Sequence, residues 1–274
     1  MTIARRFDIP SNRVLVMGVV NVTPDSFYAG SRSSSAARAI ETGLAMIDAG
    51  ADILDIGGES SRPGASPVTA DVEQKRILPV IAGLRSKTDC PISVDTTKSD
   101  VAAAALAEGA TWVNDISALR SDANMAGVIA EADAGVVLMH MQGTPKTMQQ
   151  APQYADVVRD VRDFLLARVD VAVAAGIQRD RIILDPGIGF GKTLEHNIAL
   201  LRGLSLLCES GYPVLVGLSR KSFLGAILDL PAKERLEGTI AANTIAILQG
   251  ASMIRVHDVK EGRRTANVAV RFRR

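Results

Sequence analysis

The sequence has little cysteine and few aromatic residues, and neither sign of charge is in clear excess. The two cysteines, Cys90 and Cys208, lack the paired spacing of a zinc site or a disulfide framework, so a reduced, cytoplasmic protein is expected. Lys and Arg total 31 and Asp and Glu total 30, a balance that indicates neither a nucleic-acid-binding surface nor a membrane-binding face.

Long hydrophobic runs are missing as well. Residues 1–10 contain no apolar run that would act as a signal peptide. The longest uncharged stretch, Gly238–Ile254, is interrupted by Asn243, Thr244 and Gln249, which is typical of a helix running into a strand. We therefore expect no membrane-spanning segment.

Ala, Val, Ile and Leu are abundant, and hydrophobic residues make up 47% of the chain, enough for a large buried core. Short runs rich in Val and Ile alternate with stretches of helical length, and this alternation predicts a parallel sheet covered by helices. The short runs are Val14–Val20, Asp52–Ile56, Ile92–Val94, Thr111–Val113, Val136–Met139, Arg181–Leu184, Val214–Val216 and Ser252–Val256. The helical stretches include Ser35–Ala49, Ala70–Ser86, Tyr154–Ala175 and Lys233–Gln249.

A weak repeat supports this pattern, because Gly50, Gly109, Gly135 and Gly250 each precede a predicted strand, where glycine caps the end of a helix. The length of 274 residues suits one barrel of eight strand–helix units. The sequence therefore predicts an α/β fold, a single (β/α)8 barrel in one domain over residues 1–274. An open, doubly wound sheet is the alternative.

The predicted strands end in polar or glycine-rich residues. One such residue is as often a helix cap as a functional group, but eight strand ends of this kind together indicate an active site at the carboxyl-end rim of a barrel. The polar strand-end residues are Asn21, Asp55, Asp95, Asn114, Asp115, His140, Asp185, Ser219, Arg255 and His257.

Cations gather at the same rim, and they predict a site for an anionic group such as phosphate. The loops after the last two strands of a barrel usually bind phosphate, and Ser219–Ser222 begins a predicted helix whose N–H groups suit an anion. The alternative is that Arg220 and Arg255 pair with helix acids. The cations are Arg62, Arg220, Lys221, Arg255 and His257.

Polar groups that would point toward the barrel axis predict a flat heterocycle as the ligand. Asp95, Asn114, Asp185 and Lys221 occupy the relevant strand ends, and a ring with an amino-amide edge would give a carboxylate two hydrogen bonds. Asn21 is either a Mg²⁺ ligand through its side-chain oxygen or a turn residue before Thr-Pro-Asp.

The glycine run Asp185–Lys192 (DPGIGFGK) fails both nucleotide motifs. The first glycine of a P-loop would fall on Pro186, and the last glycine of the dinucleotide fingerprint would fall on Lys192. We interpret the run as a loop that lets substrate approach the backbone closely.

Several of these segments together resemble the dihydropteroate synthase family of folate biosynthesis, in order and over nearly the whole chain. They are Met17–Phe27 (MGVVNVTPDSF), Asp55–Gly64 (DIGGESSRPG), Ser93–Thr96 (SVDT), Val113–Ile116 (VNDI), Leu138–Gly143 (LMHMQG), Asp185–Lys192 (DPGIGFGK), Gly217–Ser222 (GLSRKS) and Ile254–Asp258 (IRVHD).

The resemblance implies a transferase that joins 6-hydroxymethyl-7,8-dihydropterin diphosphate to 4-aminobenzoate and releases diphosphate. It implies that Arg255 stacks on the pterin and, with His257, Asn21 and a Mg²⁺ ion, holds the diphosphate. It also implies a homodimer and inhibition by sulfonamides, although the sequence leaves the sensitivity of this chain open. The implied catalytic residues are Asp95, Asp185, Lys221, Arg255 and His257. The implied substrate-binding residues are Asn114, Ser61, Arg62, Pro63, Phe27, Met139, Phe190, Gly217, Ser219, Arg220 and Ser222.

The chain departs from the family pattern at two places. Ser61 stands where the family commonly has Thr, which keeps a hydroxyl. Tyr28–Ser31 (YAGS) stands where the family usually reads Ser-Asp-Gly-Gly, so Ala29 replaces an aspartate of the first loop. This change puts turnover in doubt more than pterin binding, and it leaves a non-catalytic pterin-binding paralogue as one alternative. A pterin-dependent methyltransferase is the other.

Overall fold

The computed structural model describes residues 12–23, 32–61 and 64–273, with the side chains of residues 32–35 left out. Within these ranges eight parallel strands form one sheet in the order β6-β5-β4-β3-β2-β1-β8-β7. The two ends of that order meet at a bridge between Leu184 and Val214, which nearly closes a barrel. The strands are β1 (Leu15–Asn21), β2 (Ile53–Gly57), β3 (Ile92–Asp95), β4 (Trp112–Asp115), β5 (Gly135–Met139), β6 (Ile182–Asp185), β7 (Leu215–Gly217) and β8 (Met253–Val256).

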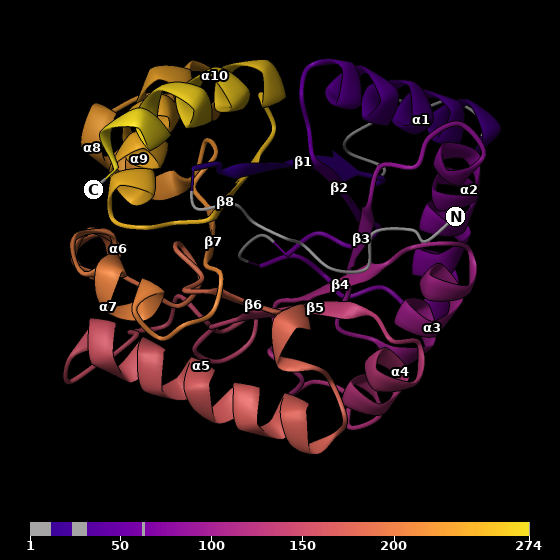
Figure 1. Cartoon of the computed structure of the whole chain (residues 1–274), viewed down its shortest axis with the longest axis horizontal. Helices are drawn as coiled ribbons and strands as arrows, with labels where there is room; N and C mark the ends of the chain where they lie inside the picture. The colour runs from indigo at the N-terminus through magenta and orange to yellow at the C-terminus, as the bar shows by residue number, and fades with distance from the viewer. Residues whose placement is uncertain (1–11, 24–31, 62–63, 274) are drawn as a thin grey trace.

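Helices surround the strands in an outer ring (Figure 1). The helices are α1 (Arg32–Asp48), α2 (Ala70–Arg85), α3 (Ser99–Ala107), α4 (Met125–Glu131), α5 (Val157–Ala174), α6 (Leu194–Arg202), α7 (Leu204–Cys208), α8 (Ser222–Leu228), α9 (Leu236–Leu248) and α10 (Val259–Ala269). Short 3-10 helices are η2 (Arg179–Arg181), η3 (Ala232–Glu234) and η4 (Val270–Phe272). No helix in the described part of the chain has the length and apolar character needed to span a bilayer.

The interior of the barrel is filled by side chains rather than by solvent. Trp112 is the largest of them and is 1% exposed. It fits because Gly135 faces it from β5, where an added Cβ would lie 2.4 Å from the indole ring. The interior cluster is Leu15, Met17, Ile53, Trp112, Val137, Ile183, Leu215 and Met253. A second, larger core packs the helices onto the outside of the sheet.

The predicted barrel is confirmed, and the open-sheet alternative is wrong, because β6 and β7 meet. Most element boundaries move by one to three residues. Six of the eight strands end one or two residues later than predicted, because polar or glycine residues continue the ladder, and backbone pairing extends as far as Thr96 N–H, which donates to Asn114 O at 3.2 Å. Helix α5 begins at Val157 rather than at Tyr154, because the Asp156 carboxylate accepts the N–H of Val158 and caps the helix.

Candidate active site

The carboxyl-end rim carries a cluster of charged and polar side chains centred on Arg255 of β8. Its Nε donates to Asp55 Oδ2 at 2.6 Å, and its Nη2 donates to Asp95 Oδ2 at 2.8 Å. Asn114 Nδ2 donates to the same Asp55 oxygen at 3.0 Å. Side chains from β2, β3, β4 and β8 therefore meet, although Arg255 is 200 residues from Asp55 in the sequence.

This cluster holds acceptors that lack donors. Asp55 is 0% exposed and Asn114 is 3% exposed, and neither Asp55 Oδ1 nor Asn114 Oδ1 has a hydrogen-bond partner among the described residues. Buried acceptors are nearly always paired in folded proteins. At a strand-end rim, this shortage of donors fits a ligand that brings its own N–H groups.

Burial also perturbs the acids and the cation of this cluster. It raises the pKa of Asp95 to about 7, against the opposing effect of the Arg255 guanidinium. Burial by itself would lower the pKa of Arg255, but Asp55 and Asp95 raise it above its ordinary value. Arg255 therefore stays cationic, while Asp95 titrates near neutral pH.

A second pair, Asp185 at the end of β6 and Lys221 after β7, lies across the barrel mouth. Asp185 Oδ1 accepts the N–H of Gly187 at 2.7 Å, and Lys221 Nζ donates to Ile188 O and lies 4.6 Å from the Phe190 ring centroid. Burial raises the pKa of Asp185 against the Lys221 charge, and burial lowers the pKa of Lys221 to about 8. Each group is thus the counter-charge of the other in a poorly solvated site.

The glycine run between them has a different role from the one predicted. Gly187 has φ +65°, and an added Cβ there would lie 1.9 Å from His140 O. Gly191 similarly faces the backbone of Gln142. The glycines are required by the close approach of two chain segments, so the interpretation of the run as room for substrate was wrong at these two positions.

Lys192 completes this loop and was missed by the sequence analysis. It is 3% exposed, and its Nζ lies 2.9 Å from His140 Nδ1 and donates to Phe190 O at 2.8 Å. Burial lowers its pKa to about 7. Its position at the end of the glycine run was visible in the sequence, but the buried partner His140 was not.

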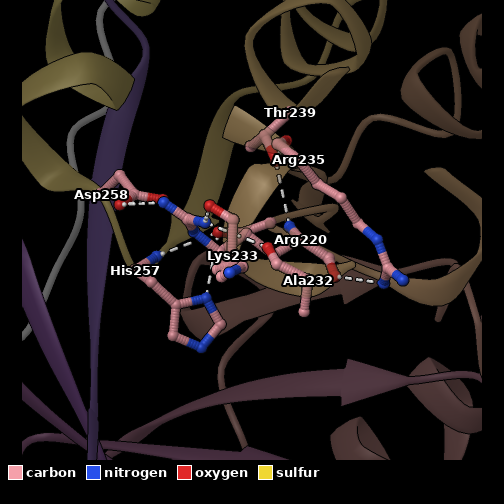
Figure 2. A network of polar contacts seen from close by, with 8 residues as sticks. Arg220, Ala232, Lys233, Arg235, Thr239, His257 and Asp258 are labelled. Carbon is pink, nitrogen blue, oxygen red and sulfur yellow. Dashed lines mark hydrogen bonds and ion pairs between the residues drawn. The ribbon is translucent and has the colours of Figure 1, made fainter. Parts of the chain in front are cut away.

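The Arg220 guanidinium makes its hydrogen bonds to other groups of the protein (Figure 2). Its Nε and Nη2 donate to the two oxygens of Asp258 at 2.7 and 2.9 Å, and its Nη1 donates to Ala232 O and Lys233 O at 3.0 and 2.6 Å. For Arg220 the structure therefore shows the alternative, pairing with an acid, and the acid is Asp258 at the start of α10. In this arrangement the guanidinium joins the loop after β7 to η3 and to the start of α10.

Ser219 and His257 lie next to that network. His257 Nδ1 is 3.0 Å from Ser219 Oγ, and the backbone N–H of His257 donates to the same oxygen at 3.2 Å. His257 is exposed at the rim, and Figure 2 shows its ring close to Arg220. Ser219 thus orients an imidazole at the mouth of the barrel.

The other predicted site residues fall into two groups. Asn21 pairs in register with Gly57, and a Cβ added at Gly57 would lie 3.8 Å from Asn21 Oδ1 and 3.7 Å from Asp95 Oδ2. Gly217 ends β7, Ser222 begins α8, and Met139 and Phe190 pack in one apolar cluster. Phe27, Arg62 and Pro63 lie outside the described residues, as does Ala29.

A cavity of about 610 Å³ opens beside the cluster, under the loops that follow β2 to β5. Its walls combine charged groups with apolar ones, including Ser61, Asp95, Ile116, Met141 and Lys98. Asp55 belongs to the Arg255 cluster beside this cavity. The sequence analysis noted Asp55 at a strand end but gave it no role. A charged residue in the middle of the apolar run Asp52–Ile56 was the signal for it.

Comparison with protein families gives one matching model, described as pterin binding enzyme, over residues 17–257. The chain is 48% identical to a dihydropteroate synthase of Synechocystis over 258 residues, covering 94% of this chain and 89% of that protein. It is 46% identical to the dihydropteroate synthase of Escherichia coli K12 over 246 residues, covering 90% and 87%.

Solved structures agree with this result. A dihydropteroate synthase of Clostridium difficile, studied in the presence of pteroic acid, has a TM-score of 0.92 at 44% identity and covers 98% of this chain and 100% of that one. One from Xanthomonas albilineans with 4-aminobenzoic acid has a TM-score of 0.88 at 44% identity, covering 96% and 93%. One from Yersinia pestis with a sulfonamide drug complex has a TM-score of 0.91 at 42% identity, covering 96% of each chain.

Proposed function

Because the chain belongs to the dihydropteroate synthase family of pterin-binding enzymes, we infer that it condenses 6-hydroxymethyl-7,8-dihydropterin diphosphate with 4-aminobenzoate. The products are 7,8-dihydropteroate and diphosphate, so the enzyme is a transferase. The relatives give no support to a methyltransferase or to a non-catalytic paralogue.

The observation that carries this function is the supply of acceptors at the rim. A dihydropterin presents ring N–H groups and an amino group as donors. The structure provides three acceptors for them, which are the Asp185 carboxylate and the buried oxygens Asn114 Oδ1 and Asp55 Oδ1. We propose that Asp185 and Asn114 bind the donor edge of the pterin and that Lys221 donates to its ring acceptor. Asp95, the fourth pterin ligand of our proposal, also holds Arg255.

The chemistry follows from the charges around the reacting methylene carbon. The bond from this carbon to the diphosphate oxygen breaks with its electron pair leaving on the diphosphate, and positive charge develops on the pterin. Asp95 and Asp185 stabilise that charge, and Arg255 lies against the ring. The uncharged aniline nitrogen then attacks the carbon and loses a proton to solvent. Catalysis rests on orientation and electrostatics rather than on a strong base.

The leaving group lies, in this proposal, between Asn21, Arg255 and His257. The side-chain oxygen of Asn21 is the kind of hard donor that Mg²⁺ prefers. Mg²⁺ commonly takes one or two protein ligands together with substrate phosphates and water, so Asn21 fits an ion that also takes oxygens from the substrate. Such an ion would supply neutralisation of the diphosphate charge.

The aminobenzoate site is proposed beside the Phe190 ring and the start of α8. Lys221 caps that helix, Ser222 is its first residue, and Ser61 approaches from the cavity side. Phe27, Arg62 and Pro63 would complete this site. Sulfonamides mimic aminobenzoate, and we propose the same subsite for them; the Yersinia pestis relative was solved as a complex with a sulfonamide drug.

We also propose a homodimer and a cytoplasmic location. Exposed apolar side chains concentrate on the last helices of the barrel, which suits a helix-packed interface. These side chains are Ile227, Leu228, Ile245, Leu248, Val268 and Phe272. Cys90 and Cys208 are both free thiols, which suits a reducing compartment.

The direct test is synthesis of dihydropteroate from both substrates by the purified protein with Mg²⁺, followed by chromatography. We expect product formation that needs both substrates. Absence of product, together with tight calorimetric binding of the pterin diphosphate, would contradict the proposed reaction and favour the paralogue.

A further inference from the structure

An ionic cluster that the reaction does not use lies beside the proposed pterin site. Lys98, in the loop after β3, donates from Nζ to Glu73 Oε2 at 2.6 Å and also to Glu59 Oε2. Glu73 lies in the first turn of α2 and is 0% exposed, whereas the side chains of Lys98 and Glu59 are each 25% exposed. One lysine thus joins a buried acid of a helix to a half-buried acid of a loop.

The position of this cluster relates it to both substrates. Glu59 is two residues before Ser61, and Lys98 is three residues after Asp95. Glu59, Ser61, Glu73, Asp95 and Lys98 all line the cavity of about 610 Å³. Lys98 therefore shares this cavity with the loop that carries Ser61 and with the acid that holds Arg255.

The beginning of the loop after β2 is held from the helix side. Arg76 Nη1 donates to Gly58 O at 2.6 Å, and a Cβ added at Gly58 would lie 2.8 Å from Ile77 Cγ2. Gly58 is thereby pressed onto α2. The next residue, Glu59, is held by Lys98, so the path of the loop up to Ser61 depends on this second contact.

A buried ion pair would need only one acid, and Glu73 alone satisfies that need. A lone buried carboxylate is costly, so neutralisation of Glu73 explains the presence of a lysine. It does not explain why Lys98 also bonds to Glu59. Burial by itself lowers the pKa of Lys98, but the hydrogen bonds that its ammonium donates to Glu59 and Glu73 raise that pKa overall, so the bridging ammonium keeps its charge.

We propose that Lys98 is a positioning residue for the aminobenzoate subsite, because its bond to Glu59 holds the loop that presents Ser61. This rests on the proposed function, in which Ser61 frames aminobenzoate. The pterin subsite is held by separate contacts of Arg255, Asp55 and Asn114, so loss of the Glu59 bond is expected to affect one substrate and not the other.

The test separates the loop-facing half of the cluster from the buried half. Glu59→Gln leaves the Lys98–Glu73 pair intact, and we expect the KM for aminobenzoate to rise about tenfold, the effect of one lost charge-assisted hydrogen bond. Calorimetric affinity for the pterin diphosphate is expected to stay within about twofold of the parent value, less than one ordinary hydrogen bond would change it. Lys75→Met, which removes an exposed lysine from α2, is the matched control and should change neither quantity.

A second pair of variants distinguishes positioning from charge neutralisation. Lys98→Met should raise the KM and lower the Tm, because Glu73 loses its counter-charge. Lys98→Met with Glu73→Gln should recover the Tm but not the KM. The proposal is overturned if Glu59→Gln has the parent KM, if both substrates weaken equally, or if the double variant recovers both properties. Failure of the proposed function would instead appear as a parent enzyme that makes no product.

Discussion

Replacing Asp185 by Asn tests the pterin site most directly. The carboxylate accepts the Gly187 N–H at 2.7 Å through Oδ1, which leaves Oδ2 to accept from the ligand. An Asn side chain that keeps the Gly187 bond must turn its NH₂ toward the pterin donors. The variant loses a charge-assisted hydrogen bond and gains a donor–donor contact, about 3 kcal/mol together, or roughly a hundredfold in Kd.

Calorimetric titration with pterin diphosphate measures this loss, and a thermal melt checks that the variant is folded. Asp133→Asn is the matched control, because Asp133 forms an ion pair with Arg181 at the opposite end of the barrel. We expect the parent affinity in the control. A folded Asp185→Asn protein that binds within about threefold of the parent would refute the assignment, since even one neutral hydrogen bond is worth more.

Four further predictions concern the same rim. The kcat/KM for pterin diphosphate should rise with pH near 7 as Asp95 ionises and fall near 8 as Lys221 loses its proton, and Asp95→Asn should remove the rising limb of the profile. Burial raises the Asp95 pKa from 3.8 to about 7, so the folded state binds more protons than the unfolded state between these two pH values. The contribution of Asp95 to the free energy of unfolding therefore falls as the pH rises from 3.8 to about 7, and urea titrations at several pH values will measure the fall. Arg255→Met leaves Asp55 buried without its cation, and the free energy of unfolding should fall by about 3–5 kcal/mol, with an unchanged urea midpoint contradicting the pairing. Gly187→Ala would place a methyl group 1.9 Å from a carbonyl oxygen, so we expect a loss of about 3 kcal/mol in stability, seen as a lower Tm.

The strands and their rim were predictable because both rest on local signals. Runs of β-branched residues mark the strands, and Asp95, Asn114 and Asp185 stand where those runs end. The rule that parallel strands expose their carboxyl ends on one side then brings distant residues together without any knowledge of contacts. What failed was the boundary of most elements, because a terminal polar residue can join the ladder or leave it.

The pairing of charges was not predictable from the sequence. Arg220 and Arg255 have the same side-chain chemistry, and the sequence predicts both as cations of the rim. Arg220 is nevertheless used on Asp258, while Arg255 bridges two acids inside the barrel mouth. The difference comes from side-chain direction at two neighbouring strand ends, which no residue pattern encodes. Lys192 was missed for the same reason, since its partner His140 lies 52 residues away.

The seam at which the barrel closes lies within the proposed heterocycle site. β6 and β7 are the two ends of the sheet, joined by the single bridge between Leu184 and Val214. Asp185 follows that bridge on one end, and Lys221 follows the other. The two proposed ligands of the ring, Asp185 and Lys221, therefore stand on either side of the seam where the sheet meets itself. Closure of the barrel is what brings the acid and the ammonium of one site together.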